Sequence, residues 1–423
     1  MKILFTLESS AGMEVKMKQI KGGVTAAKGF KAASTAAGIK YKDRTDMAMI
    51  YSEVPCAVAG TFTTNIVKAA PVKWDQHVVY DSKKAQAVIV NAGIANACTG
   101  EEGMGYCKAT AEKVNKLLQI PTDEVLVAST GVIGMQLPME KMTEGVRMLA
   151  KAIKPGEEAG TDAAKAIMTT DTRNKQVAVK VTIGGKEVTI GGMCKGSGMI
   201  HPNMCTMLAF VTTDVNISKK LLQEALSADV QDTFNMVSVD GDTSTNDTLL
   251  VLANGQAGNH EITEKGADYD TFVEALHYVN ETLAKKIAGD GEGATALFEV
   301  KVIHADNKED AKTLAKSVIT SSLTKAALFG HDANWGRILC ALGYSGAKFD
   351  PEAIELYLES SAGKILIFKD GMAADYSEEE ATRILSCSEV TALVDMKMGE
   401  AKATAWGCDL TYDYVKINAD YRS

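Results

Sequence analysis

The sequence has few aromatic residues, no long apolar run and more acidic than basic side chains. Of its 423 residues, 6% are aromatic, and the formal net charge is -9. A chain with this charge lacks the basic surface that nucleic-acid binding requires, so no nucleic-acid partner is expected. No apolar run is long enough to cross a membrane, and the apolar run near the start is too short for a signal peptide. These absences predict a soluble, cytoplasmic protein with no membrane partner.

Metal-binding and disulfide patterns are also missing. The sequence contains eight cysteines and six histidines, but no CxxC pair, and its histidines are scattered along the chain. Structural zinc sites need closely spaced pairs of such ligands, so no metal site is predicted. Small apolar residues surround most of the cysteines, which is typical of reduced thiols in a cytosolic protein.

The sequence offers two weak motifs for other chemistry. The glycines of "GDGEGAT" (289–295) follow an expected helix and precede an expected strand. The dinucleotide-binding fingerprint needs the opposite order, and no P-loop pattern occurs, so no nucleotide site is predicted. His331 and Asp332 in "FGHDANWGRI" have no GxSxG motif to accompany them. A structural hydrogen bond is therefore favoured over acid–base catalysis for this pair.

Apolar periodicity predicts a mixture of strands and helices without a regular βαβ alternation. Gly184 and Gly185 lie between two alternating segments, which is a strong hairpin signal. Ser218 is expected to begin a helix as its N-cap. Helical spacing predicts helices over 219–230, 269–288, 308–328 and 378–385, and strands are expected over 85–93, 123–130 and the terminal "TYDYVKINA". The pattern predicts a mixed α/β (α+β) fold, with sheets packed on each other and helices outside.

One stretch, "CKGSGMIHPNMCTMLAF" (194–210), raises the question of chemistry. Glycines upstream permit close backbone approach, and Pro202 rigidifies the chain shortly before Thr206. Thr206 is either a β-branched filler of a strand or a nucleophile that attacks the Cys205 carbonyl. After such a cleavage, the new α-amine of Thr206, with an ordinary pKa of about 8, could act as a general base. The residues alone leave both interpretations open.

The same stretch resembles the self-cleavage segment of the ornithine acetyltransferases, the ArgJ family. The resemblance extends from about Met17 to the last residue through "GGVTAAKGFKA", "NAGIANACTG", "VASTGVIG", "AIMTTDT", "GDGEGATALFEV", "HDANWGRI" and "INADYRS". It implies a layered α-β-β-α sandwich of the DmpA and ArgJ type, with the maturation of an N-terminal nucleophile. Cleavage between Cys205 and Thr206 would give an alpha chain (17–205) and a beta chain (206–423). Residues 1–16 would be an extension ahead of the fold, and are not expected to be part of it.

The resemblance also implies the catalytic residues. Thr206 corresponds to the nucleophile, and Thr130 with Gly131 in "STGVIG" corresponds to the pair that stabilises the oxyanion. A hydroxyl and a backbone N–H at a strand end can donate two such hydrogen bonds, although an ordinary turn is the alternative. Cys205 stands where the family commonly has alanine, and its thiol beside the scissile carbonyl could alter processing.

Five further residues correspond to substrate contacts. Lys195 would bind an α-carboxylate, and Glu292 the cationic side chain of ornithine. For both, a solvated surface charge is the alternative. Thr169 in "MTTDT" corresponds to a substrate-contacting threonine, and a polar cluster ending a helix is its alternative. Asn418 and Ser423 correspond to the tail residues that reach the substrate; Ser423 replaces the usual threonine and keeps the hydroxyl. The alternation of Val415, Ile417 and Ala419 predicts that this tail is a paired strand.

The implied function is glutamate N-acetyltransferase of arginine biosynthesis, an acyltransferase. Acetyl would pass from N2-acetyl-L-ornithine to Thr206 and then to L-glutamate, without a metal or bound cofactor. Whether acetyl-CoA also serves as a donor stays open. The implied assembly is a heterotetramer of two alpha and two beta chains. An N-terminal-nucleophile amidase or aminopeptidase of related fold, and a binding protein that lost its chemistry, are the alternatives.

Overall fold

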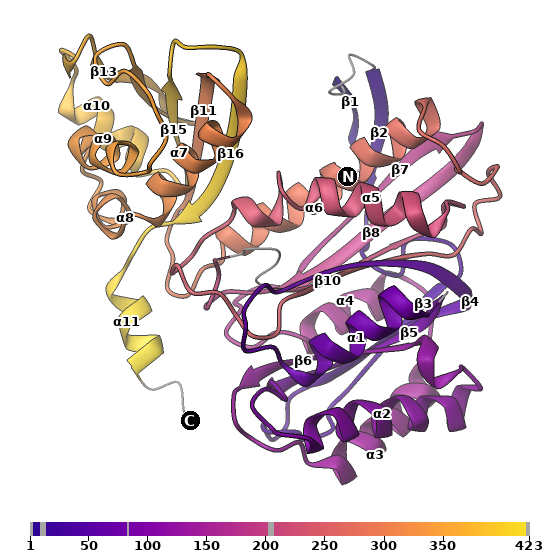
Figure 1. Cartoon of the computed structure of the whole chain (residues 1–423). Coiled ribbons are helices and arrows are strands. Elements are labelled where there is room, and N and C mark those ends of the chain that lie inside the picture. Colours follow the sequence, from indigo (N-terminus) through magenta and orange to yellow (C-terminus); the bar gives the residue numbers. More distant parts are fainter. Residues whose placement is uncertain (1–2, 9–13, 83, 202–206, 420–423) are drawn as a thin grey trace. The chain divides into compact units, whose positions relative to one another are not determined.

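The computed structural model describes residues 3–8, 14–82, 84–201 and 207–419, and the chain divides into two compact units (Figure 1). The first unit comprises the described residues of Met1–Gly196, Pro202–Asn235 and Thr243–Leu283. The second comprises those of Ser197–His201, Met236–Asp242 and Ala284–Ser423. No helix in the described part of the chain is long and apolar enough to cross a membrane.

The first unit is built on one large sheet. Its strand order is β1 (Ile3–Glu8), β2 (Glu14–Ile20), β7 (Lys175–Ile183), β8 (Lys186–Lys195), β9 (Leu208–Thr213), β10 (Thr248–Ala253), β4 (Met47–Phe62), β5 (Ala85–Ile94) and β6 (Val125–Val132), and β3 (Phe30–Thr35) pairs with β4. β9–β10 and β5–β6 are parallel, and the other pairs are antiparallel. Strand β4 pairs with β10 through one half and with β3 and β5 through the other. The sheet therefore has two arms that meet along β4.

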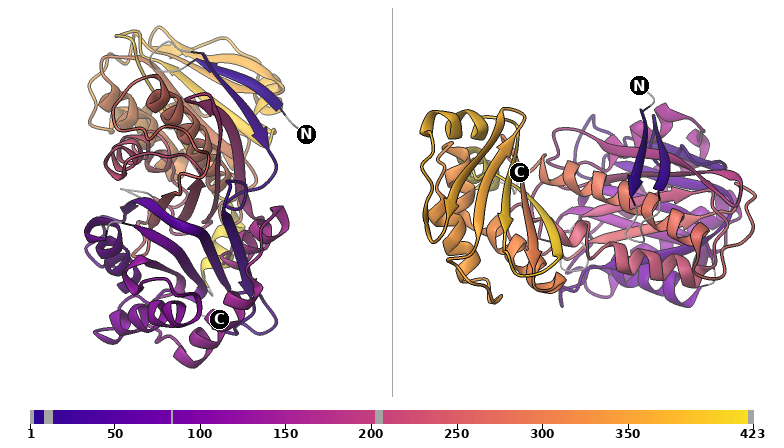
Figure 2. Two further views of the ribbon diagram at one scale, coloured as in Figure 1. Left: turned by 90° about the vertical axis from the view of Figure 1, so that its right-hand side faces the viewer. Right: turned by 90° about the horizontal axis from the view of Figure 1, so that it is seen from above.

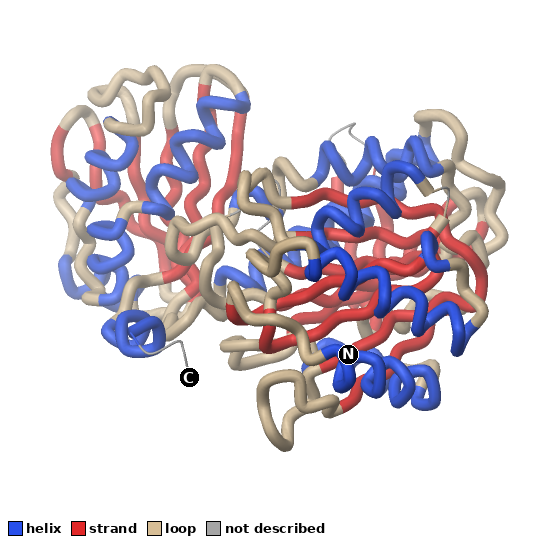
Figure 3. The backbone as a smooth tube through the Cα atoms, turned by 60° about the horizontal axis from the view of Figure 1, so that its bottom comes forward, coloured by secondary structure: helices blue, strands red, loops and turns tan. Residues whose placement is uncertain are grey.

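The two arms share a buried core, and helices cover their outer faces (Figures 2 and 3). Side chains of β5 and β6 in one arm and of β8, β9 and β10 in the other belong to one apolar cluster. Helices α2 (Glu102–Leu118) and α3 (Met139–Ala152) pack on the other face of the β5 arm, α5 (Lys219–Asp229) packs on β4, and α6 (Ala267–Ala288) packs on β8 at Gly192. Helices α1 (Ala70–Asp81) and α4 (Glu157–Ala166) also contribute side chains to the shared core. The layered, mixed α/β fold predicted from the sequence is confirmed.

The second unit has its own six-stranded sheet. The strand order is β14 (Met372–Ala373), β13 (Gly363–Lys369), β12 (Glu355–Ser360), β15 (Glu389–Asp395), β11 (Leu297–Ala305) and β16 (Ala401–Cys408). Helices α7 (Lys308–Thr320), α8 (Ser322–Phe329), α9 (Trp335–Gly343), α10 (Glu378–Leu385) and α11 (Tyr412–Ala419) complete it, and α7 packs on β11 and β16. Two single-turn helices, Thr122–Glu124 and Phe234–Met236, lie elsewhere in the chain.

Several local predictions are confirmed. Gly184 and Gly185 have φ of +54° and +73° and form the turn of the β7–β8 hairpin, in which Ile183 pairs with Lys186. Positive φ at both positions is the requirement of this tight turn, and glycine meets it without strain. The Ser218 hydroxyl caps α5 by accepting a hydrogen bond from the Leu221 N–H at 3.4 Å. α10 has the predicted bounds.

The C-terminal segment was predicted as a strand, and this is wrong. Residues Tyr412–Ala419 form helix α11, because the Thr411 hydroxyl caps its first turn by accepting from the Tyr414 N–H at 3.3 Å. The apparent alternation does not reflect burial, since Val415 and Ile417 are both exposed. A strand also needs a partner, and the chain leaves the sheet after β16 at Asp409, whose carboxylate accepts from the N–H groups of Thr295 and Ala296.

The helix predicted over 308–328 is interrupted. It divides into α7 and α8 at Ser321, which has an extended backbone and caps α8 by accepting from the Thr324 N–H at 3.2 Å. At the start of the chain, the expected extension over 1–16 contains strand β1 and the first residues of β2. In the described pairing, β2 joins β7 only from Lys18 onward, which is beyond the expected extension.

Candidate active site

Thr130 and Gly131 lie at the end of β6, beside the end of the parallel strand β5. The φ of Gly131 is +132°, and a Cβ placed there would lie 2.1 Å from the carbonyl carbon of Gly93. Only glycine allows the two backbones to approach this closely. Thr130 is half-buried, so its hydroxyl and the neighbouring N–H are donors at a tightly constrained strand end.

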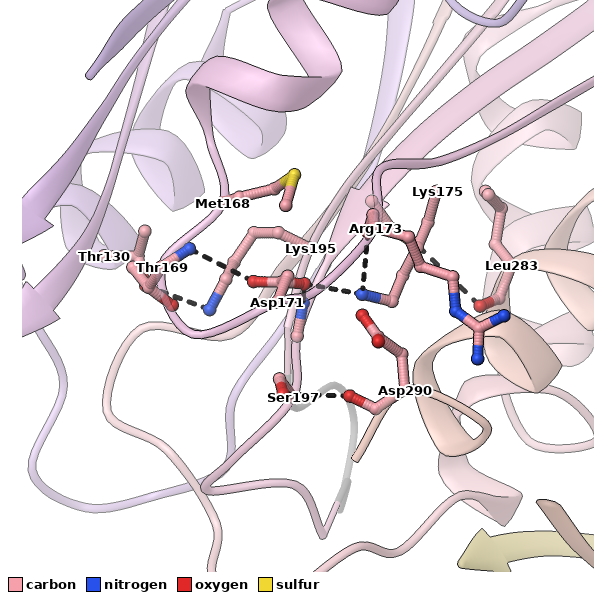
Figure 4. A network of polar contacts seen from close by, with 12 residues as sticks. Thr130, Met168, Thr169, Asp171, Arg173, Lys175, Lys195, Ser197, Leu283 and Asp290 are labelled. Carbon is pink, nitrogen blue, oxygen red and sulfur yellow. Dashed lines mark hydrogen bonds and ion pairs between the residues drawn. The ribbon is translucent and has the colours of Figure 1, made fainter. Parts of the chain in front are cut away.

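Lys195 ends strand β8 and points to Thr130 (Figure 4). Its Nζ donates to the Thr130 Oγ1 at 3.5 Å, and the side chain is 7% exposed. A solvated surface lysine is therefore excluded. A buried ammonium group next to the Thr130 hydroxyl adds positive charge where an anion would be stabilised.

Asp171 organises the residues around Lys195, as Figure 4 shows. Its Oδ1 accepts from the Gly196 N–H and from Lys175 Nζ, both at 2.7 Å, and its Oδ2 accepts from the Thr169 N–H at 3.1 Å. Burial would raise the pKa of Asp171, but the charges of Lys195 and Lys175 and these hydrogen bonds lower it to about 2. Asp171 is therefore an anion that ties Thr169 and the end of β8 together.

Thr169 lies in the loop after α4 and is half-buried. The Arg44 guanidinium donates to the carbonyls of Met168 and Thr169, the second at 3.2 Å. Together with Asp171, this contact fixes the backbone of the loop. Thr169 and Lys195 were predicted from the sequence as site residues, whereas Asp171 and Lys175 were not. The only local signal was the four-residue spacing of that acid and base, which is more often a solvated surface pair.

Glu292 and Asn418 meet within the second unit. The Asn418 Nδ2 donates to the Glu292 Oε2 at 2.7 Å, and Glu292 is 6% exposed. A Cβ on Gly198 would lie 2.3 Å from the same carboxylate oxygen, so a glycine is needed for this close approach. The Glu292 N–H donates to the Ser197 carbonyl at 2.9 Å. A solvated turn acid is therefore excluded at 292, and its buried carboxylate is suited to bind a cation.

Asp240 holds the segment that leads to the predicted cleavage site. Its carboxylate accepts from the N–H groups of Met199 at 2.6 Å and Ile200 at 2.8 Å. Met199 has a φ of +56°, which is rare for a residue with a side chain and is supported here by those two bonds. Burial and a hydrogen bond to Asp240 raise the pKa of the Tyr414 phenol, which therefore stays neutral.

Three predicted site residues, Cys205, Thr206 and Ser423, lie outside the described residues. Among the described ones, the structure brings Thr130, Lys195 and the Asp171-bound Thr169 together in the first unit and Glu292 with Asn418 in the second. Within the described ranges, no group of three or more histidine, cysteine, aspartate or glutamate side chains could hold a metal ion. The first unit offers hydrogen-bond donors for an oxyanion and a buried lysine for a carboxylate, and the second unit offers a buried carboxylate for a cation.

Comparison with known proteins identifies the family. Residues 31–423 match the model of the ArgJ family. The chain belongs to the ArgJ family. The arginine biosynthesis bifunctional protein ArgJ of Caldanaerobacter subterraneus subsp. tengcongensis is 51% identical over 407 residues, covering 96% of this chain and 100% of that protein. The protein of the same name from Thermotoga neapolitana is 50% identical, covering 94% of this chain and 99% of that protein.

Two solved structures are also similar. The arginine biosynthesis bifunctional protein ArgJ of Bacillus halodurans is 48% identical with a TM-score of 0.48, covering 50% of this chain and 97% of that chain. The ornithine acetyltransferase of Mycobacterium tuberculosis complexed with ornithine is 44% identical with a TM-score of 0.42, covering 44% and 98%. Membership of the ArgJ family, recognised from the sequence, is confirmed by the family model and the relatives. This confirms the prediction of an acyltransferase enzyme of arginine biosynthesis.

Proposed function

We propose that this ArgJ-family chain is a glutamate N-acetyltransferase that moves an acetyl group from N2-acetyl-L-ornithine to L-glutamate. The observation that carries the proposal is the family match over residues 31–423, which includes every residue predicted for the site. The half-buried position of Thr130 and the buried positions of Lys195 and Glu292 support the roles that the sequence predicts for them.

The reaction has two displacements. In the first, the Thr206 Oγ attacks the acetyl carbonyl, and the Thr206 α-amine takes the hydroxyl proton and passes it to the departing nitrogen of ornithine. The carbonyl oxygen becomes an oxyanion, and the Thr130 hydroxyl and Gly131 N–H donate to it. In the second, the glutamate amine attacks the acetyl ester and loses a proton, which returns to Thr206 Oγ as the ester breaks. The products are ornithine and N-acetylglutamate.

Charged groups select the substrates. Lys195 binds the α-carboxylate that both substrates share, and Asp171 keeps the end of β8 in place. Glu292 binds the side-chain ammonium of acetylornithine, and Asn418 fixes the carboxylate by its 2.7 Å hydrogen bond. Thr169 and Ser423 complete the substrate contacts. No metal or bound cofactor takes part, and acetyl-CoA is a second donor if its thioester carbonyl reaches the same nucleophile.

The nucleophile is produced by self-cleavage between Cys205 and Thr206. The mature protein then consists of an alpha chain ending at Cys205 and a beta chain beginning at Thr206. Two such pairs form a heterotetramer in the cytoplasm. The Asp240 carboxylate accepts hydrogen bonds from the Met199 and Ile200 N–H groups. These bonds support the proposal because they fix the backbone of the segment that precedes the cleavage site.

Replacement of the nucleophile tests the mechanism. Thr206→Ala is expected to give one uncut chain of 45.0 kDa by denaturing mass spectrometry and no acetyl transfer, because the variant has neither the hydroxyl nor the new amine. Thr382→Ala, which removes an exposed hydroxyl on α10, is the matched control and should be cut and active. Acetyl transfer by purified, uncut Thr206→Ala would overturn the mechanism.

The fate of the acetyl group separates transferase from hydrolase. With acetylornithine and glutamate, the wild type should form N-acetylglutamate in step with ornithine. Free acetate in its place would show an amidase, because water would then be the acceptor. Replacing acetylornithine by acetyl-CoA in the same assay decides whether the chain has the second activity.

A further inference from the structure

The turn before β10 carries more buried polar side chains than a connection between elements needs. Thr245, Asn246 and Asp247 are between 2% and 7% exposed. The neighbouring Ser244 hydroxyl accepts from the Asn246 N–H at 3.1 Å and is hydrogen-bonded to the Asp247 carboxyl. Burying polar groups is unfavourable unless each is hydrogen-bonded. The hydrogen-bond partners of these side chains therefore show which segments the turn holds in place.

Asn246 joins the turn to the strand end that carries Thr130. Its Nδ2 donates to the Ala95 carbonyl at 2.6 Å and to the Ser129 carbonyl at 2.8 Å. Its Oδ1 accepts from the Thr245 hydroxyl at 2.6 Å, which fixes the orientation of the amide. Ser129 directly precedes Thr130, and Ala95 directly follows β5. One buried amide therefore sets the position of β6 relative to the chain after β5, and with it the direction of the Thr130 and Gly131 donors.

Asp247 joins the turn to the start of β9. Its carboxyl group accepts from the N–H of Met207, and the Met207 carbonyl accepts from the Thr248 N–H at 2.8 Å. β9 and β10 are parallel, so both begin at the same edge of the sheet. Met207 is the residue bonded to Thr206 in the sequence. Asp247 therefore holds the backbone at the first described residue after the predicted nucleophile.

The surroundings of Asp247 are unusual for a purely structural acid. Its Oδ2 has no hydrogen-bond partner among the described residues. Burial raises the pKa of Asp247 well above its ordinary value, against the charge of Lys195 and the bonds from Ser244 and Met207. Lys195 in turn donates to Thr130. Asp247 thus interacts with the lysine of the site as well as with the start of β9.

We propose that Asn246 and Asp247 are positioning residues for acetyl transfer, Asn246 for the Thr130–Gly131 donors and Asp247 for the start of the chain that Thr206 begins. The inference rests on the proposed function and names two residues of the same site. Neither side chain takes part in bond making. Each fixes a backbone segment whose misplacement weakens hydrogen bonds that form fully only in the transition state.

The signature of such a role is a loss of kcat without a loss of substrate binding. Asn246→Ala leaves the carbonyls of Ala95 and Ser129 without this donor, and Asp247→Ala releases the Met207 N–H. In each variant, kcat per cleaved chain should fall by about 10²-fold, the low end for loss of one oxyanion donor, and the KM for acetylornithine should change by less than about 3-fold. Cleaved chain is counted from the denatured mass spectrum.

Isosteric variants separate positioning from stability. Asp247→Asn keeps an oxygen that accepts from Met207, so most of the kcat should be retained. Asn246→Asp keeps the size of the side chain but cannot donate to two carbonyls, so kcat should fall as in the alanine variant. If either alanine variant does not fold, the kcat values of Asp247→Asn and Asn246→Asp decide whether these residues have a positioning role. Asn280→Ala is the matched control: Asn280 is a fully buried amide on α6 that donates to Asp229 at 2.6 Å. It should lower the Tm and leave kcat unchanged.

The outcomes are distinguishable from failure of the proposed function. If wild-type protein forms no N-acetylglutamate, the proposed function is wrong, and the positioning role that rests on it is excluded as well. If the wild type is active and Asn246→Asp keeps its kcat, positioning by Asn246 is excluded. Positioning by Asp247 is excluded if Asp247→Ala is as active as wild type, or if Asp247→Asn loses as much kcat as Asp247→Ala.

Discussion

At the scale of single residues, Gly131 is the position where geometry is most restrictive. A Cβ there would lie 2.1 Å from the Gly93 carbonyl carbon, and the φ of +132° is itself unfavourable for other residues. Gly131→Ala must therefore push the ends of β5 and β6 apart. The expected result is a loss of kcat of at least about 10²-fold with a lower Tm, measured by acetyl transfer and thermal unfolding.

Gly134 provides the control for this prediction. It also has a positive φ, +85°, but no atom lies within 4 Å of a Cβ built there. Gly134→Ala adds backbone strain of about 1 kcal/mol without a clash, so a small decrease in Tm and unchanged kcat are expected. Equal losses of activity in both variants would contradict the role of the close strand contact.

The residues of the site that stand in local motifs could be predicted from the sequence, whereas their partners in distant segments could not. Thr130, Lys195 and Glu292 stand in recognisable motifs, and the structure adds that Lys195 and Glu292 are buried. Their partners were not predicted, because hydrogen bonds such as those from Lys195 to Thr130 and from Asn246 to Ala95 join segments that no local pattern connects. Tertiary contacts of this kind are set by strand order, which periodicity alone does not determine.

At the scale of elements, capping residues and apolar spacing close in the sequence explain which helix and strand predictions were right and which were wrong. Helix α5 was predicted because a serine cap and an apolar stripe agree. Helix α10 was predicted from helical spacing alone, and the structure adds the cap at Ser377. The tail was predicted as a strand because alternation was taken for burial, whereas the Thr411 cap decides for helix α11. In the same way, the Ser321 cap divides α7 from α8 although the apolar spacing continues across it.

The contact between α5 and α6 gives a pH-dependent prediction. His277 on α6 lies 2.7 Å from the carboxylate of Asp229, the last residue of α5. Burial alone would lower the pKa of His277, but the hydrogen bond and charge of Asp229, with Glu281 and Glu274, raise it to about 9. The unfolded chain has a histidine pKa of about 6.5. The raised value means that protonated His277 stabilises the fold.

Because the pKa of His277 is raised in the folded state, its contribution to stability decreases as the pH rises. The contribution is fully present below about pH 6.5 and is lost as the pH rises through about 9, because the folded state then releases its extra proton. With the side chain 35% exposed, roughly 1 kcal/mol is expected. The Tm of wild type should exceed that of His277→Gln at pH 6, and the difference should disappear by about pH 10. A difference that grows with pH would contradict the assignment.

At the scale of the whole molecule, the predicted cleavage divides the chain between β8 and β9, two strands of one sheet. Strands β7 and β8 precede Cys205, whereas β9 and β10 follow Thr206. β9 pairs with β8 on one side, and β10 pairs with β4 on the other. The two predicted chains therefore alternate across one sheet of the first unit. Their side chains also share one apolar core, which contains residues of β5 and β8 as well as β9 and β10.

The last prediction is that cleavage leaves the two chains associated without any covalent link. Separating them would break the β8–β9 and β10–β4 ladders and expose the shared core to water, which is equivalent to unfolding the first unit. On size exclusion in native buffer, the cleaved wild type and uncut Thr206→Ala should elute at the same volume, and the two chains should separate only in denaturant. Elution of a free chain from the native cleaved protein would show that the cut lies elsewhere or that the sheet is assembled differently.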